Sequence, residues 1–467
     1  MASPTPLTPV PVRRRSLAGP LILILIGVFF LLRTMNLIDG AALRHWFAHW
    51  WPVLLIVWGV IRLAEYYSDQ RSGYPARRMG GGGVFLLIMF VIFGLGFTSF
   101  DREWPHIREN IEVDGDNPFD EWFGGQSYTF NNSAERDLPA SANLRVLSDY
   151  GDVTINAWDE SKIKVDATKK IRANEGSDGS KLDSQTQPTL TVEGNTVTVN
   201  ANTSGAGGGV SVKSDLQIWV PRLVALDLAT RKGDITVRDR AANVKASNSK
   251  GSITVEDVKG NVDLDERSKG DIHLARIKGN VSVNGQVDDS SISEVSGDVK
   301  LTGDFFGDMQ LSKLTKGFSF RSSRTDLSAA KLDGDLNMNP GDLRANNIAG
   351  PVRVLTKSTD IHFDDLNGEL RVENSNGNIE VHSVKVGPID ITNQTGDVNV
   401  VVPDKTSFQV DAHTKNGDVN SDFSNLKVES RNGESRVSGS VGSGGPTLKV
   451  TSEHGNIEIR KAGSEQG

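Results

Sequence analysis

One short motif recurs along most of this chain and limits what the chain can fold into. A glycine or a close stand-in is followed by a small polar residue and an apolar–any–apolar triplet, and the unit returns about every nine residues. Clear copies are Gly233–Val237, Gly251–Val255, Gly260–Leu264, Gly270–Leu274, Gly279–Val283, Gly297–Leu301, Gly334–Met338, Gly377–Val381 and Gly396–Val400. Each triplet suits a short strand with two inward apolar side chains and one outward side chain. The strand is entered through a turn in which Gly, Asp or Asn tolerates positive φ.

A single strand of this kind cannot bury its apolar side alone, whereas stacked copies share one continuous core. The period therefore predicts an all-β solenoid, similar to a parallel β-helix, with two strands and about 18 residues per coil. Strand-like alternation sets its predicted bounds at residues 127–461, and residues 462–467 form a tail. Coils about 4.8 Å apart place like positions in ladders. Such ladders suit an extended binding or spacer surface better than a small-molecule pocket.

The first hundred residues differ in character from the rest of the chain. Three apolar stretches predict α-helical membrane spans at about 17–38, 46–65 and 80–100, together a transmembrane region over residues 17–100. Arginines precede the first span and gather between the second and third, and fewer lie between the first and second. By the positive-inside rule, the N-terminus is expected in the cytoplasm and the solenoid outside it.

This arrangement predicts a multi-pass protein of a bacterial cytoplasmic membrane with an extracytoplasmic C-terminal domain. Residues 1–16 are then a cytoplasmic tail, and residues 101–126 a juxtamembrane connector. The basic residues before the first apolar stretch also resemble a signal peptide, although no small-residue cleavage site follows Leu32. Removal of that segment would still leave the C-terminal domain outside.

Charge divides the chain in the same place. Residues 1–100 carry nine Arg and three Asp or Glu, which leaves a net charge of −14 on the rest of a chain whose total is −8. A domain this acidic lacks the basic footprint that nucleic-acid binding needs, so that class is excluded. The chain has no cysteine, which excludes disulfides and thiol chemistry.

Two segments of the sequence carry a resemblance to known families. Leu144–Ile155 (LRVLSDYGDVTI), Ile218–Arg222 (IWVPR) and the downstream Gly-Asp and Gly-Asn units resemble a bacterial adhesin-type β-strand-repeat domain of unknown function, over about residues 127–461. Residues 17–100, with Trp50–Ile56 (WWPVLLI), resemble the transmembrane region of LiaI/LiaF-like proteins. The second resemblance implies a part in cell-envelope stress responses, near a two-component system. Neither family supplies catalytic residues.

The Gly-Asp units also resemble calcium-binding β-rolls, but each unit has one glycine and its acidic position is often Asn, Ser or Pro. A turn-forming role is therefore the favoured interpretation. His273 and His362 occupy the outward triplet position, whereas His382 follows its triplet. The histidines do not align on successive coils, so we expect solvated side chains and no metal site.

Parallel β-helices include polysaccharide lyases and hydrolases, whose chemistry needs a carboxylate cluster in one groove. The adjacent aspartates within the repeat are Asp288-Asp289 and Asp364-Asp365, about four coils apart and without nearby aromatic platforms. We interpret both pairs as solvated turns. The sequence therefore predicts no enzyme, with no catalytic, cofactor-binding or metal-binding residues and no cofactor.

The sequence favours a membrane-anchored extracytoplasmic protein that acts by binding or sensing, as an envelope-stress signalling accessory. Its expected partners are the lipid bilayer and either a membrane signalling protein or an envelope polymer. An adhesin or structural spacer, with the spans as a simple anchor, is the alternative. A polysaccharide-active enzyme is a third and weaker hypothesis.

Overall fold

A computed structural model describes the β-rich part of the chain and four separate residues before it. The described residues are 53, 56, 60, 67, 126–139, 141–173, 177–204 and 210–463. Among them, no helix combines the length and the apolar character needed to cross a membrane. The predicted tail at 1–16, the three predicted spans and the predicted connector at 101–126 fall almost entirely outside these residues, and remain predictions.

The chain divides into two compact units, and the second, residues 128–172 with 178–467, contains nearly all of the strands. Its first strands are β1 (Gln126–Asp137), β2 (Asn143–Ser148), β3 (Val153–Trp158), β4 (Lys162–Ala173), β5 (Thr189–Glu193), β6 (Thr196–Asn200), β7 (Ser211–Pro221), β8 (Ala225–Thr230), β9 (Ile235–Arg240), β10 (Val244–Asn248), β11 (Ile253–Val258), β12 (Val262–Ile277), β13 (Val281–Val295), β14 (Val299–Phe305) and β15 (Met309–Leu314).

The later strands are β16 (Phe318–Arg321), β17 (Thr325–Ala329), β18 (Lys331–Met338), β19 (Asp342–Asn346), β20 (Ile348–Ala349), β21 (Val352–Thr356), β22 (Asp360–Asn376), β23 (Ile379–Thr395), β24 (Val398–Val402), β25 (Phe408–Asn416), β26 (Val419–Ser421), β27 (Lys427–Arg431), β28 (Glu434–Val441), β29 (Thr447–His454) and β30 (Ile457–Lys461). One helix, α5 (Gly179–Gln185), is described among them. The predicted all-β class is confirmed.

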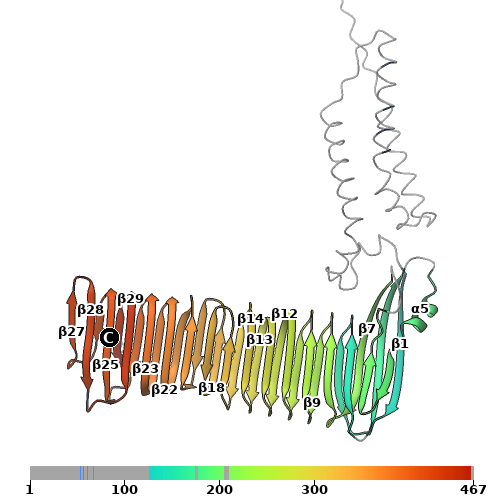
Figure 1. Ribbon diagram of the computed structural model, residues 1–467, viewed down its shortest axis with the longest axis horizontal. Helices are drawn as coiled ribbons and strands as arrows, with labels where there is room; N and C mark the ends of the chain where they lie inside the picture. The colour runs from blue at the N-terminus through green and yellow to red at the C-terminus, as the bar shows by residue number, and fades with distance from the viewer. Residues whose placement is uncertain are drawn as a thin grey trace, which may run out of the picture. The chain divides into compact units, whose positions relative to one another are not determined.

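Most strands pair in parallel with the strand one repeat further along the chain. Val244 of β10 pairs with Val262 of β12, and Ile253 of β11 pairs with Ile272 of β12, offsets of 18 and 19 residues. Strands therefore alternate between two ladders, one running through β8, β10 and β12 and the other through β9, β11 and β12. Figure 1 shows the strands side by side along one direction. We call the strands from β2 to β30 the coil stack.

The apolar residues of the triplets make the core of the coil stack. In β9, Ile235 and Val237 are fully buried while Thr236 between them is partly exposed, and β24 repeats the pattern with Val398 and Val400. The buried apolar residues form one contiguous cluster from Ala142 to Ile459. Each coil thus buries its two triplets only against the coils on either side, as stacked repeats require.

A reversed coil interrupts the parallel order in the middle of the stack. Strand β17 is antiparallel to both β16 and β21, and β18 is antiparallel to both β15 and β19. Two tight turns cause the reversal. At Ser322–Thr325 the backbone N–H of Ser322 donates to the carbonyl of Thr325 at 2.8 Å. At Asn339–Asp342 the Asn339 side chain accepts from the N–H groups of Gly341 and Asp342.

The unit at Gly334–Met338 therefore runs antiparallel, and the prediction of one uniform parallel stack is wrong at this coil. The second turn has the sequence Asn-Pro-Gly-Asp, which is a strong turn signal.

Near both ends of the coil stack, the repeat that comes first or last along the chain lies between two other strands. Leu144 of β2 pairs with Val197 of β6 and with Leu226 of β8, so the first repeat lies between later ones. At the other end, Leu448 of β29 pairs with Ile389 of β23 and with Val410 of β25. Strands β3 and β30 are inserted in the same way on the second ladder. Strands β2 and β3, the first of the repeats along the chain, and β30, the last, therefore lie inside the coil stack.

Helix α5 falls in a segment that the sequence shows only as polar. The Asp178 side chain caps it by accepting from the N–H groups of Ser180 and Lys181. The fully buried Lys169 of β4 holds it, because its ammonium lies 2.6 Å from the Asp183 carboxylate and 3.1 Å from the Thr186 carbonyl. A charge buried this completely is tolerated because it is paired and hydrogen-bonded.

Buried polar side chains fill one corner of each coil. Asn393 is fully buried, and its amide donates to the carbonyls of Gly377, Thr395 and Gly396 at 2.9 to 3.2 Å. Asn374 occupies the equivalent place one coil earlier, and Thr414 donates to the Gly455 carbonyl at 2.8 Å. Each of these side chains precedes a turn glycine by three residues. The turn carbonyls inside the corner are therefore hydrogen-bonded, as buried polar groups must be.

Among the described residues, Glu266 is the one carboxylate in this row of buried corner side chains. It pairs in register with Asn248 on one side and Gly285 on the other, and it is fully buried. Burial raises its pKa to about 7, although the backbone N–H of Ser268 donates to it at 3.2 Å. The native state thus holds a carboxyl group that loses its proton only near neutrality.

The register gives the first prediction. Ile272 and Val281 are 2% and 1% exposed, whereas the neighbouring Ser282 points outward. Ile272→Asp or Val281→Asp should lower the free energy of unfolding by about 3 kcal/mol or more, because each buries an unpaired charge. Ser282→Asp should change it by less than about 0.5 kcal/mol. Urea unfolding followed by circular dichroism measures all three, and equal effects would contradict the register.

Glu266 gives the second prediction. Because its folded pKa lies above its ordinary value of about 4.5, its contribution favours folding at low pH and declines as pH rises through about 7. Relative to low pH, this group lowers the free energy of unfolding by about 3 kcal/mol at pH 8. Glu266→Gln should therefore be more stable than the natural chain at pH 8 and depend less on pH. Unfolding curves at pH 5 and pH 8 test this, with the exposed Asp263→Asn on the same strand as control. An unchanged pH slope in Glu266→Gln would refute it.

Candidate functional site: a histidine–carboxylate ring on the outer row

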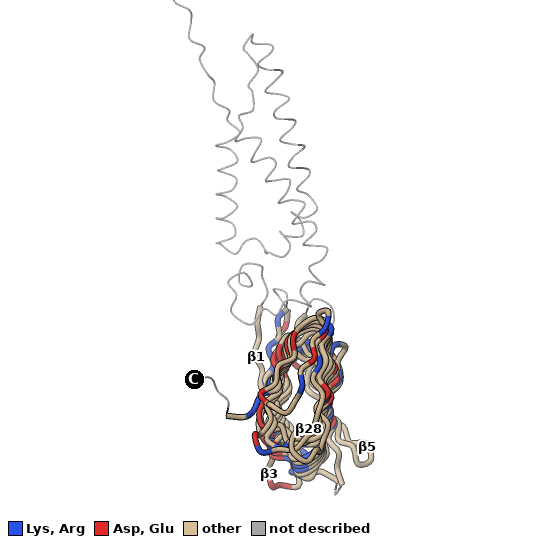
Figure 2. Tube along the Cα trace, turned by 90° about the vertical axis from the view of Figure 1, so that its left-hand side faces the viewer, with Lys and Arg blue, Asp and Glu red and all other residues tan. Residues whose placement is uncertain are grey.

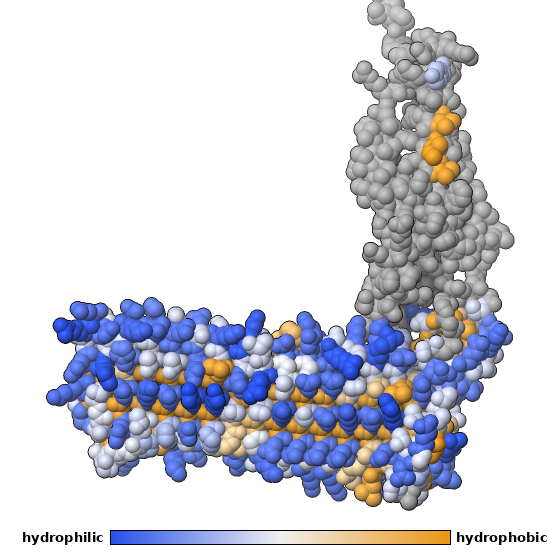
Figure 3. All heavy atoms as spheres, in the orientation of Figure 1, coloured by the Kyte–Doolittle hydropathy of each residue, from blue (hydrophilic) through white to orange (hydrophobic). Residues whose placement is uncertain are grey.

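The outward side chains of one ladder form a continuous row along the coil stack. In register order the row contains Thr254, His273, Ser291, Gln310, Asn337, Arg344, His362, Glu380 and Asn399. We call this the outer row. On the face of the stack drawn in Figure 3, apolar residues show in lines between broader rows of hydrophilic residues. Charged groups gather near the two histidines of the row, with uncharged side chains between.

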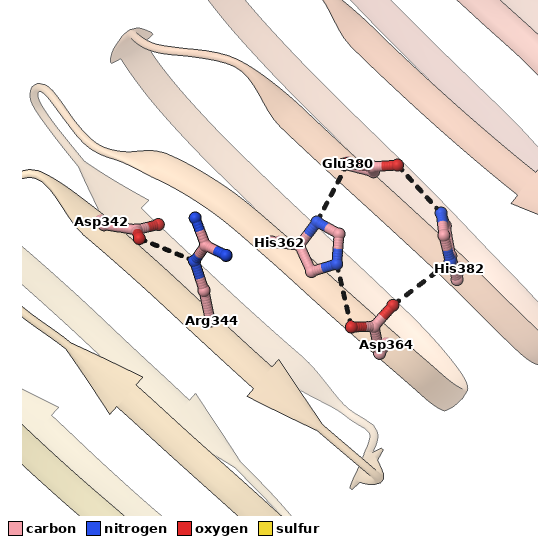
Figure 4. Close-up of polar contacts among 6 residues, drawn as sticks. All are labelled: Asp342, Arg344, His362, Asp364, Glu380 and His382. Carbon is pink, nitrogen blue, oxygen red and sulfur yellow. Dashed lines mark hydrogen bonds and ion pairs between the residues drawn. The ribbon is translucent and has the colours of Figure 1, made fainter.

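Two histidines and two carboxylates form a closed ring across β22 and β23 (Figure 4). His362 Nδ1 lies 3.0 Å from Glu380 Oε2, and His362 Nε2 lies 2.9 Å from Asp364 Oδ2. His382 Nδ1 lies 3.2 Å from Asp364 Oδ1, and His382 Nε2 lies 3.0 Å from Glu380 Oε1. The imidazole centroids are 5.6 Å apart. Every ring nitrogen therefore faces a carboxylate oxygen. We call these four residues the His–carboxylate ring.

The strand geometry explains why these residues meet. His362 and Asp364 are two residues apart on β22, and Glu380 and His382 are two residues apart on β23, so each pair points to the same side. His362 pairs in register with Glu380. The two strands thus present His and acid in opposite order, and each histidine has one carboxylate along its strand and one across.

The positions of the histidines in the sequence repeat did not predict the ring. The repeat places His362 and His382 at different positions, which is correct, but we expected them to be apart, which is wrong. One sequence signal could have identified the ring: histidine and acid exchange places between positions 18 residues apart. Glu380 lies 18 residues after His362, and His382 lies 18 residues after Asp364.

The ring is partly open to solvent and has one further charged neighbour pair. Its side chains are 29% to 44% exposed. Arg344 of β19 lies next to His362 in the outer row, and its guanidinium donates to the Asp342 carboxylate at 2.7 Å. That bond raises the pKa of Arg344, with weaker contributions from the charges of Asp360 and Asp364. On the other side, β24 places the uncharged Asn399 and Val401 beside Glu380 and His382.

A second charged group surrounds Glu256 of β11. Its carboxylate lies 3.1 Å from Arg238 Nε, 3.4 Å from His273 Nε2 and 3.7 Å from Arg276 Nη2. Arg276 also pairs with Asp257 at 2.7 Å, which lowers the pKa of that carboxyl. His273 therefore belongs to a group in which one carboxylate meets three basic side chains, and takes no part in the His–carboxylate ring.

The two acidic pairs that the sequence singled out have different surroundings. Asp288 and Asp289 are both exposed, and Asp289 accepts from the backbone N–H of Asp308 at 2.8 Å. Asp365 is exposed and has a φ of 53°, as expected of a turn. Asp364 contributes to the His–carboxylate ring, so its interpretation as a solvated turn residue is wrong.

The acid of the Gly-Asp units has a structural use. Asp234 Oδ1 accepts from the backbone N–H of Ser252, one coil further, at 2.8 Å, and Asp360 Oδ1 accepts from that of Asn378 at 2.8 Å. Asn378 continues the series to Asp397 at 3.0 Å. Asp and Asn are interchangeable for this bond because both offer a side-chain oxygen. In the part of the chain that the structure describes, no group of three or more His, Asp or Glu side chains is arranged to hold a metal ion.

The ladder on the other side carries alternating charges. Arg145, Asp227, Lys245 and Asp263 follow one another in register. Arg145 and Asp227 are 3.8 Å apart and 55% exposed, so this pair adds little stability. Figure 2 shows acidic and basic residues mixed around the stack. This face has no uniform sign of charge.

Comparison with solved structures finds adhesin-type and lipid-binding proteins. A "putative cell adhesion protein" from Clostridium sporogenes has 13% identity over 72% of this chain and 100% of its own length, with a TM-score of 0.16. A "putative adhesin" from Parabacteroides distasonis has 11% identity over 71% and 97%, with a TM-score of 0.24. A "putative lipid binding protein" from the same species has 12% identity over 71% and 96%, with a TM-score of 0.23.

Comparison with protein families covers both parts of the chain. No curated protein matches it. The family model described as Toastrack DUF4097 matches residues 141–460, and the model described as the LiaF transmembrane domain matches residues 18–107. The first match includes the repeats and the His–carboxylate ring, and the second includes all three predicted spans. The chain therefore belongs to the Toastrack DUF4097 family and is a membrane-associated protein with a LiaF transmembrane domain before its β-strand repeats.

Proposed function

We propose that this chain is a membrane-anchored, extracytoplasmic binding or sensing protein of the bacterial envelope, acting as an envelope-stress signalling accessory. The observation that carries the proposal is the order of its parts, a LiaF transmembrane domain at 18–107 followed by a Toastrack domain at 141–460. The Toastrack part is then a β-solenoid whose outward rows meet the exterior. The transmembrane part contacts a membrane signalling protein.

The surface of the coil stack supports binding over a length rather than reaction at a point. The Gly-Asp carboxylates are committed to coil-to-coil hydrogen bonds, and most of the other charged groups near the outer row are paired with one another. Catalysis by carboxylates needs an acid and a base around one substrate position. The His–carboxylate ring pairs its members internally, which suits a surface that responds to its surroundings.

A structural spacer or adhesin is the second candidate, and the inserted repeats of the coil stack favour it. Strands β2 and β29, the first and last repeats of one ladder, each lie between two other strands, so these repeats resist fraying. A stack built in this way can hold a ligand or another surface at a fixed distance from an anchor.

Membrane topology gives the third prediction. The arginines that precede the first predicted span and gather between the second and third favour a cytoplasmic N-terminus and an external coil stack. Protease added to intact spheroplasts should therefore degrade or release the part after residue 100 and spare residues 1–16 and 66–78. Antibodies against tags at each end detect the fragments. Protection of the C-terminal part until the membrane is opened would contradict the topology.

An anchor exchange separates the two candidate functions and gives the fourth prediction. Replacing residues 1–100 with unrelated membrane spans of the same topology should abolish the envelope-stress output if those spans contact a signalling partner. A spacer should tolerate the exchange. Deleting one coil, residues 244–261, with the natural spans kept, should weaken function only partly, because each coil contacts only its neighbours. A reporter of envelope stress is measured in both variants at equal protein abundance.

A further inference from the structure

We propose that the His–carboxylate ring is a proton-binding site through which the external part of the protein responds to acidity. In acid, both imidazoles carry two protons and close the ring between β22 and β23. On loss of those protons the ring opens and leaves two carboxylates exposed. The proposal deepens the sensing role proposed above and rests on that role for its meaning in the cell.

The argument begins with a count of protons. Three of the four ring nitrogens make hydrogen bonds of 2.9 to 3.0 Å to a carboxylate oxygen, and the fourth, His382 Nδ1, faces Asp364 as an ion pair at 3.2 Å. Neutral histidine carries one N–H, and the other nitrogen is an acceptor. Carboxylates also only accept. A neutral His362 can therefore donate in only one of its two hydrogen bonds, and the other contact brings lone pairs together. Two imidazolium ions supply a donor for all three hydrogen bonds and make the contact of His382 Nδ1 with Asp364 an attraction between opposite charges.

The charges lead to the same conclusion. Two imidazolium ions and two carboxylates cancel, and each hydrogen bond between them is charge-assisted, which makes it about twice as strong as a neutral one. Loss of both protons leaves two uncompensated negative charges side by side. Histidine is the side chain whose charge ordinarily changes between about pH 5 and 8, and loss of both protons takes the ring from a net charge of zero to −2.

The surroundings leave the change in charge uncompensated. The nearest basic side chain in the row, Arg344, is already bonded to Asp342. Asp360 on β22 adds negative charge, and β24 contributes only Asn399 and Val401 at the adjacent positions. Beyond β24, Arg460 of β30 is paired with Glu458. The protons themselves are therefore the positive charge that balances Asp364 and Glu380.

The ring lies beside a shift of register in the pairing of β22 with β23. The register of these strands shifts between Phe363 and Leu366, next to Asp365 with its φ of 53°. Regular pairing on one side of the shift ends at Phe363 and Val381. The ring residues bridge the two strands at that end, so a closed ring holds the strands together where the backbone pairing is irregular, and an open ring releases them.

Amide hydrogen exchange of the full-length protein in lipid nanodiscs tests the proposal. Peptides that cover residues 360–384 are followed by mass spectrometry at pH 5.5 and pH 7.5, with rates corrected for intrinsic exchange. Because one charge-assisted hydrogen bond and one ion-pair attraction are gained in acid, exchange in this segment should be about tenfold slower at pH 5.5. Glu380→Gln should remove the difference, because an amide can both donate and accept and so satisfies neutral histidines.

The control is Asp390→Asn, an outward carboxylate of β23 on the other ladder, which should keep the full difference. Equal protection at both pH values in the natural chain would overturn the proposal, as would a difference that persists in Glu380→Gln. Protection at pH 7.5 that appears on addition of Zn²⁺ and is absent in acid would also overturn it and identify a divalent cation as the ligand.

The stress reporter in cells separates this site from the proposed function. A reporter that responds to external pH in the natural chain and loses that response in Glu380→Gln, but not in Asp390→Asn, supports both. A ring that closes in acid in the exchange experiment while the reporter ignores pH leaves the proton site standing and contradicts the sensing role.

Discussion

The structure depends on the contact of each coil with the next. A triplet such as Ile235–Val237 buries two apolar side chains, too few for a core of its own. Parallel pairing at offsets of 18 and 19 residues places triplets of successive coils over one another, so the apolar pairs join into one core and the strands satisfy each other's backbone groups. Each coil is therefore stable only as a member of the stack.

Polar side chains complete what the apolar pairs begin. At one corner, Asn374 and Asn393 donate to turn carbonyls that would otherwise lie buried without a partner. At the start of the triplets, Asp or Asn bonds to the backbone of the next coil. The same repeat that resembles a calcium motif thus performs a structural task with side-chain oxygens alone. Glu266 departs from the corner pattern, and its raised pKa is the cost of placing a carboxyl group there.

The coil stack departs from its regular repeat near both ends and in the middle. The first and last repeats are inserted between other strands, and the reversed coil at β17 and β18 joins two parallel halves. The outermost strand at the C-terminal end, β27, is exposed along its length and alternates charged residues at Lys427, Glu429 and Arg431. Charged side chains on an edge oppose pairing with another chain.

The sequence by itself determined the all-β class, the repeat length and the inward side of each strand, because a period of nine and a triplet of alternating polarity are local properties of the chain. Its resemblances also agree with the two matched families. Only the tertiary structure decided which repeats are inserted, since sequence order and stacking order differ at β2 and β29. The tertiary structure also decided which residues meet in the His–carboxylate ring. His362 and Asp364 are distant from Glu380 and His382 along the chain, and the coil geometry alone brings their charges within hydrogen-bonding distance.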